Sequence, residues 1–294
     1  YHGGVLVVVG HEISPHGGHM LAFATEHEIP HADRSEAQIC AAVTAAGGIA
    51  YAAHPFSEGS RISARIGRPH AWRALDDCDC GVELWSLATD AAEACASVGD
   101  LVRLLRRPEP IVDGPPARHL RIWDRLCATR RVPALAGLDA HQTGLRIAGR
   151  ALSPLPHARW FRLLQTNLLL DRPPSGDLSA DRAAVHAALR AGRAVMVRRD
   201  LGDGRGFRFW AEGAAGAVTM GEEASGNLPA TLHARLPAPA RVRLLREGAG
   251  VAAATGDRLS HAASEPGAYR IEARVDAYGG ERTWLVSNPV YLRG

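Results

Sequence analysis

Short apolar runs alternate with amphipathic stretches over the first half of the 294-residue chain. The runs are bounded by Gly or Pro, which is typical of buried strands in a parallel sheet. The predicted strands are residues 5–9, 20–23, 49–53, 81–86 and 133–137, and the predicted helices are residues 36–46, 71–75, 91–105 and 117–130. This alternation predicts an α/β sheet or barrel.

The pattern changes at about residue 205, where short alternating stretches are separated by Gly, Pro and Asn. Such stretches favour antiparallel strands in a small β-sandwich. The predicted strands are residues 207–211, 217–220, 230–236, 241–247, 268–275 and 283–286. Residues 151–200 form a bridge with an apolar stretch and a helix that ends at Gly192. We therefore predict two domains, an α/β domain with its bridging helix over 1–200 and a β-sandwich over 201–294.

Composition narrows the possible classes of protein. Apolar residues make up 46% of the chain and charged residues 22%, as in ordinary globular proteins. No apolar run reaches the roughly 18 residues of a membrane span, and no signal-peptide pattern opens the chain, so we expect a cytoplasmic protein without membrane contact. The arginines are spread along the chain, which does not indicate nucleic-acid binding. Five cysteines without a C-x-x-C pair do not predict a disulfide framework or a zinc ribbon.

Residues that bind metals recur at the ends of the predicted strands. Glu12 follows the first strand, His19 precedes the second, His54 follows the third, and Asp139 and His141 follow the fifth. In α/β barrels the carboxyl ends of the strands form the active site. Imidazole nitrogens and carboxylate oxygens together suit Zn, Mn or Fe. Such ions lower the pKa of a bound water and so supply a hydroxide nucleophile.

Other polar residues near these strand ends have weaker signals. His19 is preferred to His16 because it directly precedes a strand, and Glu83 lies near the end of the fourth strand, where its side chain would face the pocket. Arg61 and Arg65 lie in a polar loop after A-H-P-F, where guanidinium groups would hold a phosphate or carboxylate of the substrate. The alternative for both arginines is an ordinary solvated loop. Together these residues predict a small anionic substrate.

Five segments, taken in order, resemble the PHP (polymerase and histidinol phosphatase) superfamily of metallohydrolases. They are G-H-E-I (10–13), G-H-M-L-A-F (18–23), A-A-H-P-F (52–56), G-V-E-L-W-S (81–86) and A-G-L-D-A-H (136–141). The ending W-L-V-S-N-P-V-Y-L (284–292) is similar to the C-terminal signature of the carbaryl-hydrolase-like branch, in which a β-rich domain follows the barrel. The resemblance implies a distorted (β/α)7 barrel with two or three divalent metal ions at the strand ends.

The same resemblance implies roles for the candidate residues. Glu12 would bridge two ions, His19 and His54 would complete one ion, Asp139 would serve a second and His141 a third. Glu12, Asp139 and His141 would thus form the catalytic set. The H-x-H, S-D-G and T-D-H elements of the family do not occur in this chain. We expect them to precede Tyr1, so that the barrel here lacks its first strands.

Three functions are compatible with this pattern. The first is a metal-dependent phosphoesterase, in which a metal-bound hydroxide attacks phosphorus. The second is hydrolysis of a carbamate, ester or amide at the same site. The third is a degenerate, non-catalytic barrel that binds a ligand or partner. We expect the first, and the sequence does not indicate an oligomeric state.

Overall fold

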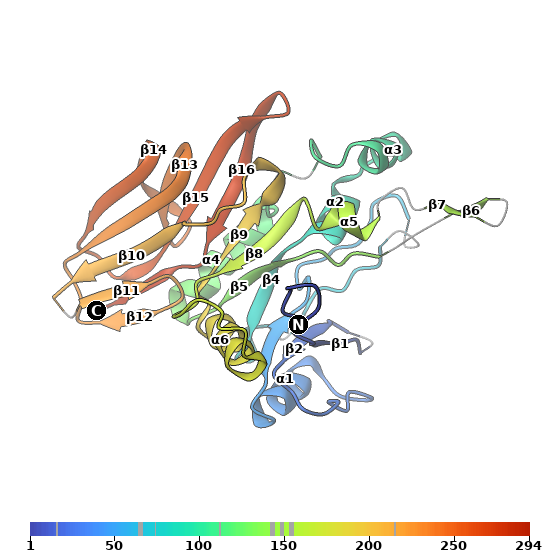
Figure 1. Ribbon diagram of the computed structural model, residues 1–294, viewed down its shortest axis with the longest axis horizontal. Helices are drawn as coiled ribbons and strands as arrows, with labels where there is room; N and C mark the ends of the chain where they lie inside the picture. Colours follow the sequence, from blue (N-terminus) through green and yellow to red (C-terminus); the bar gives the residue numbers. More distant parts are fainter. Residues whose placement is uncertain are drawn as a thin grey trace.

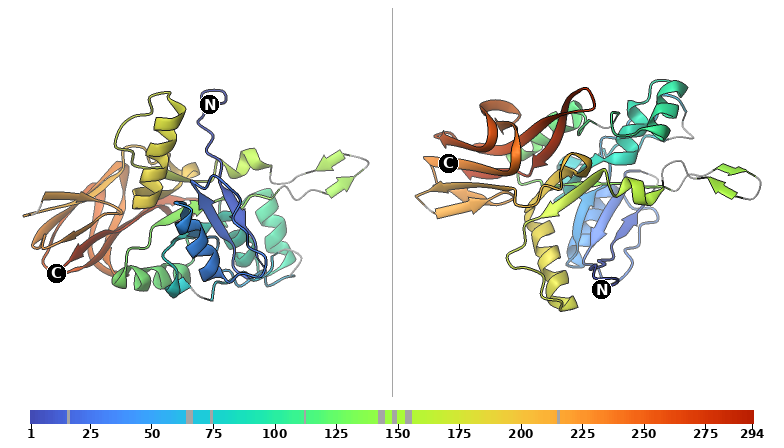
Figure 2. Two further views of the ribbon diagram at one scale, coloured as in Figure 1. Left: turned by 90° about the horizontal axis from the view of Figure 1, so that it is seen from below. Right: turned by 45° about the horizontal axis from the view of Figure 1, so that its top comes forward.

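The computed structural model describes residues 1–15, 17–63, 67–73, 75–111, 113–141, 145–147, 150–152, 156–214 and 216–294. Within these residues the chain forms a five-stranded sheet, a ten-stranded sheet and a two-stranded hairpin. Figure 1 shows the first sheet with its helices on one side and the second sheet, in orange and red, on the other. The hairpin of β6 (Leu145–Ile147) and β7 (Arg150–Leu152) projects away from both sheets (Figures 1 and 2).

The five-stranded sheet has the order β1-β2-β3-β4-β5. Its strands are β1 (His11–Ile13), β2 (Met20–Phe23), β3 (Ile49–Ala52), β4 (Gly81–Ser86) and β5 (Ala134–Gly137). The first three pair antiparallel, whereas β3, β4 and β5 pair parallel. Parallel pairing places the carboxyl ends of β3 to β5 at one edge of the sheet. The predicted mixed α/β region is confirmed, but the described residues form an open sheet rather than a closed barrel.

The prediction of a buried strand over residues 5–9 was wrong. Val5, Val7 and Val9 are 63%, 59% and 78% exposed, and the strand of this region begins later, at β1. An apolar run predicts burial only if another layer covers it. Among the described residues β1 pairs with β2 alone and is an edge of the sheet, so the preceding valines lie in solvent.

Helices connect these strands and pack on the sheet. They are α1 (Glu36–Ala45), the 3-10 turn η1 (Leu75–Asp77), α2 (Leu87–Ala94), α3 (Val98–Arg106), α4 (Ala117–Thr129), α5 (His157–Trp160), α6 (Leu178–Ala191) and the 3-10 turn η2 (Arg199–Leu201). The predicted helix over 91–105 is two helices, because Ser97 caps a new helix through a reciprocal pair of hydrogen bonds with Asp100. None of the helices in the described ranges is both long and apolar enough to cross a membrane.

The second sheet is antiparallel apart from a short parallel edge between β12 and β17, and it curls into a half-barrel (Figure 2). Its strands are β8 (Leu164–Leu168), β9 (Ala194–Arg198), β10 (Arg208–Gly213), β11 (Gly216–Thr219), β12 (Glu223–Ser225), β13 (Ala230–Arg246), β14 (Ala249–Ala263), β15 (Gly267–Ala277), β16 (Gly280–Ser287) and β17 (Val290–Arg293). The predicted sandwich is therefore one curled sheet. The strands predicted at 230–236 and 241–247 are parts of β13. Strands β8 and β9 join this sheet from before residue 201, and the division of the chain at that residue stays a prediction.

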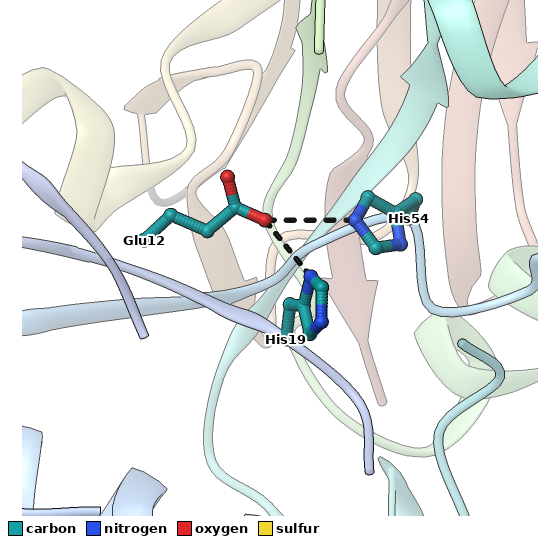
Figure 3. Close-up of side chains that lie close together, drawn as sticks. All are labelled: Glu12, His19 and His54. Atoms are coloured by element: carbon teal, nitrogen blue, oxygen red, sulfur yellow. Dashed lines mark hydrogen bonds and ion pairs between the residues drawn. The ribbon is translucent and has the colours of Figure 1, made fainter. Parts of the chain in front are cut away.

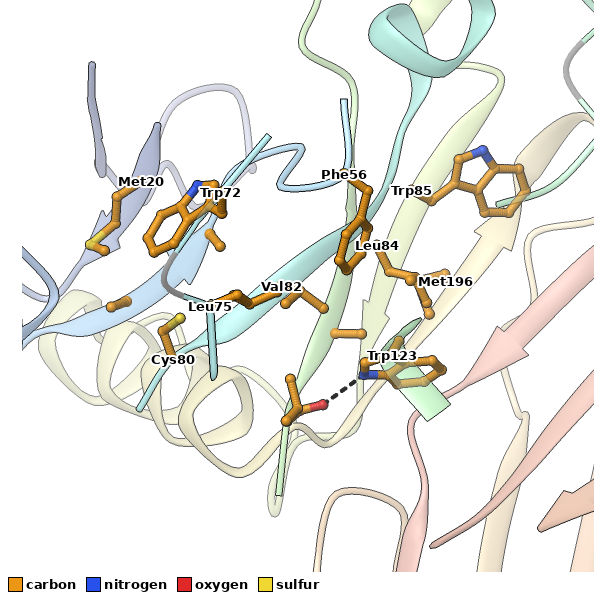
Figure 4. Close-up of a cluster of buried hydrophobic side chains, with 14 of the residues drawn as sticks. Met20, Phe56, Trp72, Leu75, Cys80, Val82, Leu84, Trp85, Trp123 and Met196 are labelled. Atoms are coloured by element: carbon orange, nitrogen blue, oxygen red, sulfur yellow. Dashed lines mark hydrogen bonds between the residues drawn. The ribbon is translucent and has the colours of Figure 1, made fainter. Parts of the chain in front are cut away.

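The two sheets share a hydrophobic core. Trp85 of β4 and Trp123 of α4 are fully buried, and Met196 of β9 belongs to the same cluster (Figure 4). The indole nitrogen of Trp123 donates to the carbonyl of Val132, 2.9 Å away. The core therefore spans the junction between the sheets.

A buried ion pair also crosses this junction. Arg270 of β15 donates to both carboxylate oxygens of Asp124 on α4, at 2.6 and 2.8 Å, and to Glu272 at 2.7 Å. The side chain of Arg270 is only 2% exposed, so its charge is compensated by these carboxylates rather than by water. Helix α4 is thus fixed to the second sheet.

We predict that Asp124→Ala lowers the free energy of unfolding by about 3–5 kcal/mol, because it leaves a buried guanidinium with one partner fewer. Urea denaturation of both proteins measures the difference. Asp276→Ala is the matched control, since Asp276 pairs with Arg241 in solvent, where water screens the pair. Equal effects of the two substitutions would contradict the role of the buried pair.

Candidate metal centre

Glu12, His19 and His54 lie together at one edge of the five-stranded sheet (Figure 3). The Nδ1 atom of His19 is 3.0 Å from Oε1 of Glu12, and Nε2 of His54 is 3.7 Å from the same oxygen. The two imidazole rings are 5.1 Å apart between centroids and inclined at 71°. One ligand atom from each residue lies within 4.8 Å of the others. Ligand atoms this close together are candidates to surround a single ion.

Strand register explains why three residues far apart in sequence meet. In the antiparallel pair of β1 and β2, Glu12 is opposite Leu21, so the connection returns His19 to the side of Glu12. Strand β3 continues this register, and the amide of Ala53 donates to the carbonyl of His19 at 3.0 Å. His54 is the next residue after Ala53 and therefore also lies beside His19.

The charges at the site favour an ionised Glu12. Hydrogen bonds from His19 and then from His54 hold the pKa of the Glu12 carboxyl well below its usual range, although burial opposes this. Burial opposes charging of His54, but its hydrogen bond to Glu12 and the fields of Glu83 and Asp139 raise its pKa. A carboxylate held in its charged form next to two imidazoles is suited to bind a cation.

Glu83 of β4 holds His54 in place. Its Oε2 accepts a hydrogen bond from the backbone N–H of His54 at 2.8 Å, and its side chain is buried. His54 has a φ of 30°, a left-handed conformation that costs free energy and needs such support. Burial raises the pKa of Glu83 to about 7. A Cβ at Gly137 would lie 1.8 Å from Oε1 of Glu83, so the neighbouring strand leaves room for this carboxyl only because residue 137 is glycine. Glu83 therefore positions His54, and the place of its side chain in the substrate pocket stays a prediction.

Asp139 and His141 lie near this group but are not part of it. Asp139 accepts a hydrogen bond from the Thr89 hydroxyl at 2.7 Å, and its charge is close enough to help raise the pKa of His54. The Nδ1 atom of His141 is 2.8 Å from the carbonyl oxygen of Asp139, and its side chain is 73% exposed. The predicted roles of both residues as ligands and catalytic groups stay predictions.

Arg61 and Arg65 are the two arginines that were predicted to bind the substrate. Arg61 is exposed, and neither a hydrogen bond nor an ion pair is found for it within the described ranges. Arg65 lies outside the described residues, as does His16, the alternative to His19. Binding of a substrate by Arg61 and Arg65 stays a prediction.

Sequence reasoning missed His70. Its ring lies 4.3 Å from that of His19 and 5.6 Å from that of His54, between centroids. Burial, together with the neighbouring His19 and His54, lowers the pKa of His70 and so favours its neutral form. Next to it, the indole of Trp72 donates to the carbonyl of His19 at 2.8 Å and ties this loop to the site. His70 follows a polar loop rather than a strand, so the rule that predicted the other residues gave no signal for it.

The donor set fits a divalent transition metal. Two imidazoles with one carboxylate match Zn, Mn or Fe better than the all-oxygen shells of Ca or Mg. The Nε2 atom of His54 faces Glu12, whereas its Nδ1 is buried and has no hydrogen-bond partner within the described ranges. The described residues contain one candidate ion site, and the number and identity of the ions stay predictions.

Comparisons of the chain with protein-family models, with curated proteins and with solved structures find no match.

We predict that Glu83→Ala weakens Zn²⁺ binding by roughly 10- to 100-fold, because outer-shell partners of metal ligands contribute that much. Glu83→Gln is the matched control, since its amide oxygen still accepts from the His54 backbone. Isothermal titration of both variants with Zn²⁺ measures the effect. An affinity equal to that of the wild type in the alanine variant, with a normal circular dichroism spectrum, would exclude the positioning role.

Proposed function

We propose that this protein is a metal-dependent hydrolase that acts on a phosphate ester. The observation that supports the proposal most is the convergence of Glu12, His19 and His54. A divalent ion held by these residues would lower the pKa of a coordinated water toward neutrality and provide a nucleophile. Glu12, His19 and His54 would hold that ion at the edge of the sheet.

The proposal also covers the type of fold to which the five-stranded sheet belongs. Three PHP-like segments supply the candidate ligands, a fourth supplies Glu83, and the fifth supplies Asp139 at the end of the parallel strand β5. We propose that the five-stranded sheet is part of a distorted (β/α)7 barrel of the PHP type. In that arrangement Asp139 and His141 would serve further ions.

The contacts of Glu12 and Glu83 indicate what each residue contributes to the site. Glu12 stays ionised between the two imidazoles and would offset part of the charge of the ion, while Glu83 fixes the backbone of His54. Arg61 and Arg65 would hold the substrate phosphate from the loop after β3. A carbamate, ester or amide at the same ion is the alternative substrate class, and a binding protein without turnover is the other alternative.

We predict that Glu12→Gln and His54→Ala each lower phosphoesterase activity by more than about 100-fold, because each removes a direct ligand of the ion that activates water. The assay compares p-nitrophenyl phosphate, bis-p-nitrophenyl phosphate and an aryl N-methylcarbamate, each with added Mn²⁺ or Zn²⁺. Turnover of a phosphate ester is the expected result.

Exposed neighbours provide matched controls. Glu28→Gln and His27→Ala change the same residue types outside the candidate centre and should keep full activity. Turnover of the carbamate alone would replace the phosphoesterase proposal with the second function. Metal binding without turnover of any of the three substrates would support the non-catalytic protein.

A further inference from the structure

A second cavity lies at the opposite end of the same parallel strands. Its volume is about 570 Å³, within the range of small-molecule sites, and it is lined by the starts of β3 and β4 and by Pro133 just before β5. His54 and Asp139 follow the other ends of β3 and β5. The cavity is therefore separate from the candidate metal centre. Elements of the second sheet complete its wall, through Glu223 of β12 and Arg293 of β17.

The cavity wall has an excess of positive charge. Four arginines line it, namely Arg130, Arg131, Arg190 and Arg293, against two carboxylates, Asp79 and Glu223. Glu223 is paired with Arg293 at 3.0 Å. For Arg130, Arg131 and Arg190, no ion pair with a carboxylate is found within the described ranges. The formal charge of the wall is thus +2, and three of its guanidinium groups lack a counter-charge.

These arginines also have a structural role that accounts for part of their donors. Arg190 donates to the carbonyls of Gly47 and Gly48 beyond the end of α1, and Arg131 donates to the carbonyl of Ala191 at the end of α6. Cations at helix ends stabilise the exposed carbonyls there. The helix dipoles partly offset the positive charge of the wall, but they do not use all of the guanidinium N–H groups.

Unused donors remain at the wall. Arg130 donates through Nη2 to the carbonyl of Leu75 at 2.9 Å, and its Nη1 is enclosed by protein, so Arg130 contributes charge to the wall rather than a free donor. Arg131 uses one nitrogen for Ala191, and its other N–H groups have no partner among the described residues. An exposed guanidinium with free donors at a cavity wall, such as that of Arg131, is suited to a phosphate or carboxylate, which accepts two parallel hydrogen bonds.

We propose that this cavity binds a small organic anion that carries a phosphate or several carboxylates. The apolar side chains of Ile49, Pro133 and Leu189 give its organic part a surface, and the arginines hold its charge. The site lies between the two sheets, so an occupant would contact both. The inference does not depend on the proposed hydrolase activity.

Titration calorimetry of the EDTA-treated, dialysed protein with inorganic pyrophosphate, AMP and citrate tests the proposal. We expect binding of at least one of these anions that weakens as NaCl is raised, because salt screens the charges. Pyrophosphate and AMP report a phosphate site, and citrate reports a carboxylate site. Absence of binding by all three at millimolar concentration would overturn the proposal and leave the arginines as helix-end contacts only.

Two kinds of variant act in opposite directions. Arg131→Gln and Arg190→Gln should each weaken binding by roughly 10- to 100-fold, the value of one charge-assisted hydrogen bond. Asp79→Asn should strengthen binding, because Asp79 is an exposed carboxylate at the wall that repels the anion. A variant that only destabilised the fold would not bind more tightly.

Matched controls locate the site. Arg121→Gln and Arg125→Gln change exposed arginines of α4 that do not line the cavity and should leave the affinity unchanged. Glu12→Gln should also leave it unchanged, since Glu12 belongs to the other end of the sheet. Loss of anion binding in Glu12→Gln would place the anion at the metal centre and contradict the second site.

Discussion

Asn288 joins the two sheets through the hydrogen bonds of its buried side-chain amide. Its side chain is fully buried, accepts from the amide of Ala134 at 2.7 Å, and donates to the carbonyls of Ala134 and Ala194 at 2.8 and 2.9 Å. Leaving such a group unpaired costs about 1–3 kcal/mol, so the starts of β5 and β9 are held in one arrangement. Strand β5 then places Pro133 at the arginine-lined cavity and Asp139 beside the candidate metal centre.

The candidate centre depends on a balance between burial and charge. His54 is buried in an unfavourable backbone conformation, and the hydrogen bond to Glu83 compensates for it. Glu12 is ionised because it pairs with the imidazoles of His19 and His54, and in turn its charge raises the pKa of His54. The conformation of His54 and the charge of Glu12 therefore depend on the other residues of the site. Titratable groups whose pKa values depend on one another are common at ligand-binding and catalytic sites.

Much of this could be predicted from local sequence. Strand β4 and helix α1 follow from short-range patterns, and residues next to predicted strands gave Glu12, His19 and His54. The failures involve long-range packing. The run at 5–9 reads as buried, but whether a strand is covered depends on distant segments. His70 comes close to His19 through a loop, and the hydrophobic pattern of a sequence does not predict the path of a loop. The hydrogen bond between Glu83 and the His54 amide likewise depends on contacts that local sequence does not show.

The central claim is that Glu12, His19 and His54 bind one divalent ion. Anomalous diffraction from crystals grown with Zn²⁺ tests it most directly. We expect an anomalous peak about 2.0–2.2 Å from a nitrogen of His19, a nitrogen of His54 and an oxygen of Glu12. Strong peaks elsewhere on the protein, with none among these three side chains, would contradict it.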